Sequence, residues 1–195
     1  MLQIFNNMKL VRESISFQRY KDPKRALGVG ARVLIEEWLE EMSVENYVIN
    51  DDLTIDVNGR VNLSHKNLSS FPEYIKFRNV SGYFFCDNNQ LTSLEGCPST
   101  VEGFFYCDNN QLTSLEGCPS NVRESFSCNN NQLISLKGCP SSVGRSFFCN
   151  NNQLTSLEGC PSTVGGSFFC RNNKKQFSEE EVRKYCKVKG NIYDS

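Results

Sequence analysis

The sequence lacks several features that would point to common functions. It has no run approaching the roughly 20 apolar residues of a membrane span, and its first residues lack the apolar core of a secretion signal. It contains one histidine, no Cys-x-x-Cys pair and a formal net charge of −1. Nucleic-acid binding needs a surplus of Lys and Arg, and structural zinc usually needs paired ligands. We therefore expect a cytoplasmic protein without nucleic-acid, membrane, metal or cofactor partners.

What is present instead is a strict internal repeat. Nine of the ten cysteines fall on two ladders with a step of 21 residues, which are Cys86, Cys107, Cys128, Cys149 and Cys170, and Cys97, Cys118, Cys139 and Cys160. The same step separates phenylalanines from Phe84 to Phe168, leucine pairs from Leu91 onward, and asparagines from Asn89 to Asn173. A repeat period of about 20 to 50 residues predicts a solenoid, in which each unit stacks on its neighbours.

Each unit between residues 80 and 173 divides into two parts. The first part reads Val-x-(Gly)-x-Phe-x-Cys, and its period of two predicts a strand with Val, Phe and Cys directed inward. The second part contains Asn-x-Leu-x-x-Leu and Gly-Cys-Pro-Ser, where Gly and Pro exclude a helix and predict an extended turn. The predicted fold is therefore mainly β, with four full units, a degenerate first coil and a partial last one.

The unit F-x-C-x-x-N-x-L-T-x-L resembles a leucine-rich repeat in which cysteine takes the place of the third leucine. It is similar to the short LTSLEGCP-type repeats of proteins from bacteriophages and bacteria. The segment FQRYKDPKRALGVG also resembles a stretch that precedes such repeats in phage proteins. The resemblance implies a short leucine-rich-repeat solenoid encoded by a phage, and it identifies no partner.

The residues before the array predict a basic arm. Residues 1–30 hold breakers at Pro23, Gly28 and Gly30 and show no sustained period, so we expect mostly irregular structure. Seven basic residues lie between Met1 and Arg32, whereas residues 33–56 carry eight acids and no base. This asymmetry is typical of a solvated arm beside an acidic cap, or of a peptide that docks on an acidic partner.

Residues 31–79 predict an α/β cap over the open N-terminal end of the solenoid. The period of apolar residues between Ala31 and Met42 predicts a helix whose apolar stripe holds Leu34, Ile35, Trp38, Leu39 and Met42. Alternating apolar residues around Asn58-Gly59 predict a β-hairpin. Residues 60–71 match the apolar positions of the repeat and are interpreted as a degenerate first coil.

Residues 174–195 predict a small helical cap at the C-terminal end. Ser178 precedes three glutamates, which is typical of a helix N-cap with acidic residues in the first turn. Val182, Tyr185 and Cys186 are predicted to lie on the last coil, and Gly190 to end the cap.

The repeated cysteines and asparagines are interpreted as structural. Equivalent cysteines in neighbouring coils would lie ~4.8 Å apart with parallel side chains, a geometry that disfavours disulfides. They are expected to be small buried hydrophobes, while Asn89 and its equivalents satisfy backbone groups of the turn. Only Cys186 stands outside the ladders, and His65 lies at the other end of the array, so we expect no catalytic residue and no enzyme.

The outward positions of the predicted strands form the candidate binding site. The fold requires no large apolar side chains there, and exposed aromatic residues that cluster on one sheet are typical of interfaces. The candidate partner-binding residues are Tyr83, Phe85, Asp87, Phe104, Tyr106, Asp108, Phe148, Phe169 and Arg171. In the alternative interpretation, the aromatic residues stack on one another and only stiffen the sheet.

Charged positions on neighbouring coils lead to two further expectations. Asp87 and Asp108 are predicted to stack as like charges, which is mildly unfavourable unless solvent screens them or a cationic group of a partner lies there. Glu124 and Arg145 occupy the same repeat position on consecutive coils, which predicts an ion pair between the coils.

Together these patterns predict a non-enzymatic, monomeric scaffold that binds a host or viral protein through its exposed sheet. The expected location is the cytoplasm of an infected cell. An alternative is a structural or accessory virion protein that is attached through its N-terminal arm. A third possibility, an effector that presents substrates to its own enzymatic domain, would need a domain for which residues 174–195 are too short.

Overall fold

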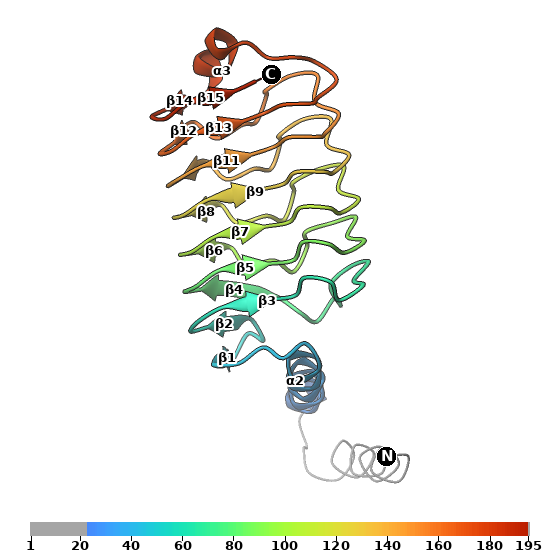
Figure 1. Cartoon of the computed structure of the whole chain (residues 1–195). Helices are drawn as coiled ribbons and strands as arrows, with labels where there is room; N and C mark the ends of the chain where they lie inside the picture. Colours follow the sequence, from blue (N-terminus) through green and yellow to red (C-terminus); the bar gives the residue numbers. More distant parts are fainter. Residues whose placement is uncertain (1–22, 195) are drawn as a thin grey trace.

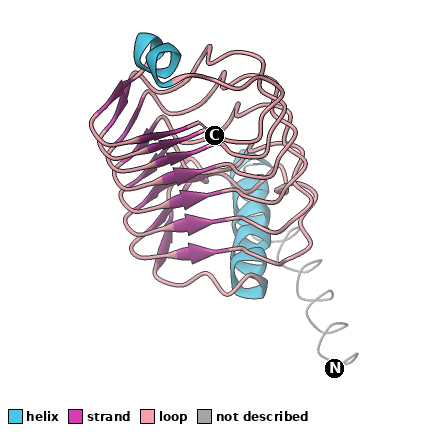
Figure 2. Ribbon diagram, turned by 45° about the horizontal axis from the view of Figure 1, so that its top comes forward, coloured by secondary structure: helices cyan, strands magenta, loops and turns pink. Residues whose placement is uncertain are grey.

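The computed structural model describes residues 23–194, with side chains from residue 30 onward. The chain winds into a β-solenoid, with helix α2 (Pro23–Glu41) at one end and helix α3 (Glu179–Tyr185) at the other (Figure 1). Strands form one side of the stacked coils and loops form the opposite side (Figure 2). Strand partners in neighbouring units are 21 residues apart, as in Phe105 and Phe126. The predicted mainly β solenoid with two helical ends is therefore confirmed.

Two sheets run the length of the solenoid. Sheet A has eight strands in the order β1-β2-β4-β6-β8-β10-β12-β14, and sheet B has seven in the order β15-β13-β11-β9-β7-β5-β3. All neighbours pair in parallel except β1 (Tyr47–Ile49), which is antiparallel to β2 (Ile55–Val57). The other strands of sheet A are β4 (Phe77–Val80), β6 (Thr100–Val101), β8 (Asn121–Val122), β10 (Ser142–Val143), β12 (Thr163–Val164) and β14 (Lys187–Val188). Sheet B contains β3 (Val61–Asn62), β5 (Phe84–Phe85), β7 (Phe105–Tyr106), β9 (Phe126–Ser127), β11 (Phe147–Phe148), β13 (Phe168–Phe169) and β15 (Ile192–Tyr193).

The stretch from Val to Cys is not the single strand that its period of two predicted. In each unit it forms two short strands, one in each sheet, and the chain turns a corner between them. Gly103 lies at one such corner, where an added Cβ would lie 2.6 Å from the carbonyl oxygen of Gly82 in the preceding coil. The corner therefore brings backbone against backbone, which favours glycine. The predicted inward direction of Val, Phe and Cys is confirmed, because the apolar side stays inside through the turn.

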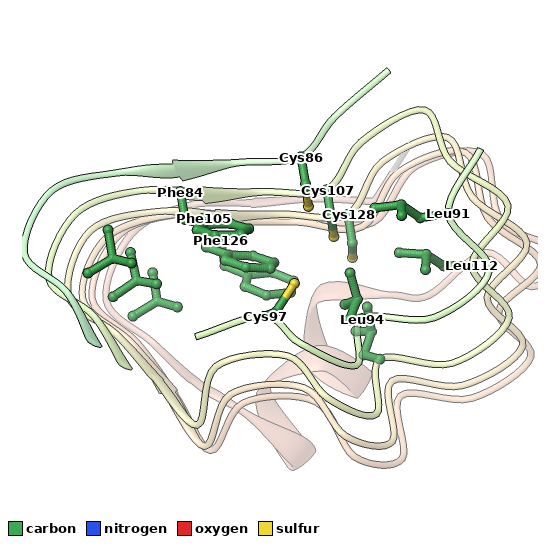
Figure 3. Packing of buried hydrophobic residues seen from close by; sticks show 14 of the residues in the cluster. Phe84, Cys86, Leu91, Leu94, Cys97, Phe105, Cys107, Leu112, Phe126 and Cys128 are labelled. Atoms are coloured by element: carbon green, nitrogen blue, oxygen red, sulfur yellow. The ribbon is translucent and has the colours of Figure 1, made fainter. Parts of the chain in front are cut away.

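The interior of the solenoid is built from ladders of identical side chains. The rings of Phe84, Phe105 and Phe126 stack one above another inside the coils, with Leu91 and Leu94 approaching from the loop side (Figure 3). Centroids of successive inner rings are 5.1 to 5.6 Å apart, and all five rings are 0% exposed. At roughly 25 cal/mol per Å² of buried apolar area, these ladders dominate the stability of the fold.

The start of each turn is fixed by a residue in the left-handed backbone conformation, which the repeat pattern did not predict. The first asparagine of each Asn-Asn pair has a φ between 52° and 55°, and these residues are Asn88, Asn109, Asn130, Asn151 and Asn172. Asparagine is among the few residues other than glycine that adopt this conformation readily. Backbone geometry thus explains the first asparagine of the pair, and hydrogen bonding explains the second.

Helix α2 of the N-terminal cap is longer than predicted, and the set of its residues that faces the core differs from the predicted set. Helix α2 begins at Pro23 rather than at Ala31, so part of the predicted irregular arm is helical. Proline is tolerated there because the first helical N–H groups lack partners in any case. Trp38 packs against Phe71 and Phe77, at 6.3 and 6.4 Å between ring centroids. Leu34 was predicted in the buried stripe but is 42% exposed, since the buried face runs through Ile35, Trp38, Leu39 and Met42.

The predicted hairpin at Asn58-Gly59 is wrong. The hairpin is formed by β1 and β2, with Tyr47 opposite Val57, and its turn lies at residues 50–54. Asn58-Gly59 instead forms the first corner between the sheets, because β2 belongs to sheet A and β3 to sheet B. Gly59 has a φ of 145°, which favours glycine at a corner as it would in a hairpin turn. The degenerate first coil is confirmed, and it begins earlier, at Ile55.

The C-terminal residues add a seventh coil that was not predicted. The N-cap is confirmed, since Ser178 Oγ accepts from the backbone N–H of Glu181 at 3.2 Å. Helix α3 buries Val182, whereas Tyr185 is 52% exposed and does not lie on the last coil as predicted. After the helix, β14 pairs with β12 and β15 pairs with β13, so the cap does not end at Gly190. The segment Val188-x-Gly190-x-Ile192 repeats the Val-x-Gly-x-Phe pattern, which could have identified this coil.

Candidate binding face on sheet B

The outer face of sheet B carries three rows of side chains that run along the solenoid. The central row contains Phe85, Tyr106, Ser127, Phe148, Phe169 and Tyr193, which are register partners on successive strands. The row before each strand contains Tyr83, Phe104, Ser125, Ser146, Ser167 and Asn191. The row after each strand contains Asp87, Asp108, Asn129, Asn150 and Arg171. All nine predicted site residues therefore lie on one face.

Most of the aromatic side chains on this face stack on one another. Phe85 stacks on Tyr83 and on Tyr106, with centroids 4.1 and 4.8 Å apart and planes within 15°. Phe104 lies tilted beside Tyr106 at 5.8 Å. Further along, Phe169 stacks on Phe148 and on Tyr193, at 4.4 Å in both cases. We call Tyr83, Phe85, Phe104 and Tyr106 the lower aromatic cluster, and Phe148, Phe169 and Tyr193 the upper aromatic cluster.

A serine coil separates the two clusters. Ser125 and Ser127 occupy the positions that Phe104 and Tyr106 occupy in the preceding coil, and they are only 7% and 4% exposed. Their predicted outward positions are confirmed by register, but both side chains are covered. The aromatic side chains on either side remain half-buried, so part of each ring stays available to a partner. The face consequently offers two aromatic surfaces with a polar strip between them.

The aspartates at the edge of this face have structural partners. Asp87 accepts a hydrogen bond from the hydroxyl of Ser64 at 2.5 Å. Asp108 accepts from the hydroxyl of Ser127 at 2.6 Å and from the backbone N–H of Asn129 at 2.5 Å. Asp87 and Asp108 occupy the same position on neighbouring coils, as predicted, since the backbone N–H of Asn88 donates to the carbonyl oxygen of Asp108 at 2.9 Å. Desolvation raises the pKa of Asp108, and the charge of Asp87 adds to the effect. Hydroxyl and N–H donors offset the repulsion, which neither of the two predicted explanations included.

The same edge becomes basic at the C-terminal end of the face. The guanidinium carbon of Arg171 lies 5.3 Å from the ring centroid of Tyr193, within the range of a cation–π contact. Tyr193 was missed as a site residue because the seventh coil was missed. Its signal was present, since Ile192-Tyr193 repeats the Phe-Phe pair of the preceding unit. The lower aromatic cluster is therefore bordered by carboxylates and the upper one by an arginine.

Sheet A lacks an equivalent aromatic surface. Its outward row contains Asn79, Thr100, Asn121, Ser142, Thr163 and Lys187, all of them polar. At the corner between the sheets, Glu124 forms the predicted ion pair with Arg145, and Glu102 forms a similar pair with Arg123. Exposed ion pairs of this kind are worth about 1 kcal/mol or less. Among the described coils, the aromatic residues that reach the surface concentrate on the outer face of sheet B.

The asparagine ladder has the structural role that the sequence predicted. Asn131 donates from Nδ2 to the carbonyl oxygens of Cys107 and Cys128 at 3.0 and 3.2 Å. Its Oδ1 accepts from the backbone N–H of Leu112 at 3.0 Å. Equivalent bonds recur at Asn89, Asn110, Asn152 and Asn173. These residues link successive coils and are not available to a ligand.

The cysteine ladders are free thiols inside the coils. Cys107, Cys128 and Cys149 donate from Sγ to carbonyl oxygens of the next coil at 3.3 to 3.4 Å. Burial raises the pKa of these three thiols, which makes them poor nucleophiles. The prediction of buried small side chains is confirmed for this ladder, whereas Cys118, Cys139 and Cys160 of the second ladder are only partly buried.

Within residues 23–194, no three His, Cys, Asp or Glu side chains are grouped as metal ligands would be. In that same part of the chain, neither helix has the length and apolar character needed to cross a membrane. In comparisons with known proteins, no protein-family model and no curated protein matches the sequence. Inference about function therefore rests on the geometry of the solenoid surface.

Proposed function

We propose that the protein is a non-enzymatic scaffold that binds another protein through the outer face of sheet B. The observation that carries the proposal is the set of half-buried aromatic residues in the lower and upper aromatic clusters. Aromatic residues are enriched at the centres of protein interfaces, where they supply large contact areas. The polar outward row of sheet A makes this enrichment a property of one face rather than of the repeat.

Stacking within the clusters favours binding. The predicted alternative was that the rings only stiffen the sheet, and the rings do stack, with centroids 4.4 to 4.8 Å apart in the central row. A stacked ring has lost most of its rotamer freedom before a partner arrives. Because ordering side chains costs about 0.5 to 1.5 kcal/mol each on association, a preordered surface binds at lower cost. The two interpretations are therefore compatible.

The more specific proposals rest on the repeat sequence. The LTSLEGCP-type units support assignment to the leucine-rich-repeat class and a phage origin, and with that origin the partner would be a host or viral protein in the cytoplasm. We also propose that the protein is a monomer. The corners between the sheets are charged, and the aromatic face, which is the main surface for association, is assigned to the partner. The alternative virion role depends on the basic arm, of which residues 1–22 lie outside the described residues, and it stays a prediction.

The test replaces aromatic residues of the central row with serine, which this row already contains at Ser127. A chain with Phe85→Ser, Tyr106→Ser, Phe148→Ser and Phe169→Ser is compared with the unchanged chain as bait in host-cell extract. Bound proteins are identified and quantified by mass spectrometry, and a recovered partner is then purified and its Kd is measured. We expect the serine variant to bind that partner at least tenfold more weakly. Truncating an aromatic residue at the centre of an interface commonly costs about 2 kcal/mol of binding free energy.

The control variant changes the same number of outward positions on sheet A. Thr100, Asn121, Ser142 and Thr163 are replaced by alanine, and both variants are checked for an intact far-UV spectrum. We expect the control to keep the partner at nearly unchanged affinity. Equal binding by the serine variant, or equal loss in the control, would refute the proposed use of sheet B. Recovery of the protein at fixed stoichiometry in purified virions would favour the virion role instead.

A further inference from the structure

A hollow runs along the outer face of sheet A, beside the corner between the two sheets. Its volume is about 560 Å³, within the range of about 300 to 1,000 Å³ that is typical of ligand pockets. The lining residues belong to, or directly follow, the successive strands of sheet A from β6 to β14 (Figure 1). Because neighbouring parallel strands lie about 4.8 Å apart, the hollow is elongated along the solenoid axis.

Two glycines in successive coils create the hollow. The row of residues that directly follows these strands contains Glu102, Arg123, Gly144, Gly165 and Lys189. A Cβ added to Gly144 would overlap the carbonyl oxygen of Arg123, and one added to Gly165 would overlap the carbonyl oxygen of Gly144. The coils thus approach each other closely where the row has no side chains. The hollow is therefore set by the backbone and not by movable side chains.

Three polar side chains in the hollow have no structural partner. Asn121, Ser142 and Thr163 are register partners on β8, β10 and β12, and all three line the hollow. Within residues 30–194, none of these side chains forms a hydrogen bond with the protein. On sheet B, by contrast, the side chain of Asn129 accepts from the backbone N–H of Asn150 in the next coil at 2.8 Å. The polar groups on sheet A are therefore free to donate to a ligand and to accept from it.

One charge in the hollow has no counter-ion. Arg123 forms an ion pair with Glu102, and Glu124 forms one with Arg145, so these four charges balance. Lys189 also lines the hollow and is exposed. In the part of the chain with described side chains, no ion pair or hydrogen bond engages its ammonium group. This charge distribution favours a ligand with one acidic group at the Lys189 end.

The hollow suits a hydroxyl-rich ligand better than a peptide. Peptides are commonly bound through apolar side-chain pockets or through a free strand edge. The apolar lining residues Val122 and Val143 are only 0% and 1% exposed, and the strands of the hollow are already paired on both sides. A saccharide needs neither feature, because its hydroxyls can bond the polar row and its rings can lie against the glycine backbone.

We propose that the hollow binds a short acidic saccharide that lies along sheet A with its carboxylate beside Lys189. The ammonium of Lys189 donates a charge-assisted hydrogen bond to the carboxylate. Ser142, Thr163 and Asn121 exchange hydrogen bonds with the sugar hydroxyls. From Asn121 to Thr163 these groups span two strand steps, or about 10 Å, so the site holds more than one sugar ring.

The experiment titrates the full chain with four probes and follows the backbone amides by heteronuclear NMR. The acidic probes are sialyllactose and aldotriuronic acid, each a trisaccharide with one carboxylate. Maltotriose is the neutral control, and N-acetyl-triglycine carries one carboxylate but no hydroxyls. We expect at least one acidic trisaccharide to shift the amides of Ser142, Gly144, Thr163, Gly165 and Lys189. Its Kd should be at least about fivefold lower than that of either control.

Two matched pairs of variants locate the binding. Lys189→Gln should weaken binding of the acidic trisaccharide at least about fivefold, whereas Lys187→Gln, on the same segment but outside the hollow, should change the Kd by less than about twofold. Ser142→Leu removes a hydroxyl and fills part of the hollow, so it should also weaken binding. Thr100→Leu, in the same row but outside the hollow, should not. Thermal unfolding checks that each variant is folded.

Three results would overturn the proposal. The first is that neither acidic trisaccharide binds at concentrations up to about 10 mM. The second is that maltotriose or N-acetyl-triglycine binds as tightly as the acidic trisaccharides. The third is that the two members of either variant pair lose the same affinity. The variant with four serines on sheet B should still bind the acidic trisaccharide, so failure of this proposal is distinguishable from failure of the proposed protein-binding face.

Discussion

The two faces of the same strands in sheet B follow different rules. On the inner face, the register row holds phenylalanine in all five units, with every ring fully buried. On the outer face, one residue further along the chain, the row reads Phe85, Tyr106, Ser127, Phe148 and Phe169. Ring spacing is similar on the two faces, at 5.1 to 5.6 Å inside and 4.4 to 4.8 Å in the outer row. Stacking alone therefore does not explain why the inner row is constant and the outer row varies. Packing fixes the inner residue, whereas the outer residue varies from coil to coil.

The largest expected effect tests this difference directly. Phe126→Ala should lower the free energy of unfolding by about 3 to 5 kcal/mol, because it leaves a cavity in a closed ladder. Phe148→Ala, on the outer face of the next coil, should cost about 1 kcal/mol or less, since it removes only a partly exposed stacking partner. Urea unfolding followed by circular dichroism measures both. Similar losses for the two variants would show that the outer aromatic residues are part of the core.

A second prediction concerns the polar ladder inside the coil. Asn131→Ala should lower the free energy of unfolding by about 1 to 3 kcal/mol, because the buried backbone groups that Asn131 bonds would lose their partners. The exposed neighbour Gln132 provides a matched control, and Gln132→Ala should stay within about 0.5 kcal/mol of the unchanged chain. Chemical denaturation at pH 7 gives both values. If Asn131→Ala is as stable as its control, the ladder is not structural.

A third prediction uses a carboxylate that is paired in the folded state. Asp56 accepts hydrogen bonds from Arg78, Asn50 and Asn79, and the bond from Arg78 contributes most to lowering its pKa. Its stabilising contribution is therefore present above the unfolded pKa of about 4 and is lost as the pH falls through the lower folded pKa. Asp56→Asn should cost about 1 kcal/mol at pH 7. The difference in unfolding free energy between Asp56→Asn and the unchanged chain, measured by urea unfolding, should shrink toward about pH 2.5. A difference that does not change with pH would contradict this explanation.

The smallest effect is expected for Asp108→Asn, which should raise the stability of the fold, whereas Asp56→Asn should lower it. Because desolvation raises its pKa in the folded state, the ionised group costs stability at pH 7, and this cost disappears as the pH falls below the unfolded pKa of about 4. Asn129 occupies the same row and accepts the backbone N–H of Asn150 in the same way, at 2.8 Å. Asp108→Asn should therefore raise the urea midpoint slightly at pH 7, with no gain at low pH. A clear loss of stability at pH 7 would indicate that the charge itself is needed.

The comparison of the two faces also explains how much could be predicted. The interior was predicted well, because Phe84 and its equivalents recur at one spacing and only a stack of coils buries them all. The single strand was wrong, because the period of two persists through the corner, where the chain turns at Gly82 and Gly103 and also at Glu124 and Arg145. The seventh coil was missed because Ile192 and Asp194 replace the phenylalanine and cysteine that marked the others.

The candidate binding face was predicted in part. Its residues follow from the outward positions of the repeat, and the register places Phe85, Tyr106, Phe148 and Phe169 in one row. The coverage of Ser125 and Ser127 and the hydroxyl partners of Asp87 and Asp108 depend on how side chains of different coils meet. Such contacts vary from coil to coil and have no period, so the repeat pattern could not reveal them.

The register between units has a consequence for the history of the chain. Residues 80–100, 101–121, 122–142 and 143–163 share one backbone path, and each contacts only the coil before it and the coil after it. A recombination event that removes or duplicates 21 codons would leave both caps seated on compatible neighbours. The number of coils is thus an adjustable length, by which lineages could move the lower and upper aromatic clusters closer together or further apart in whole steps of one coil.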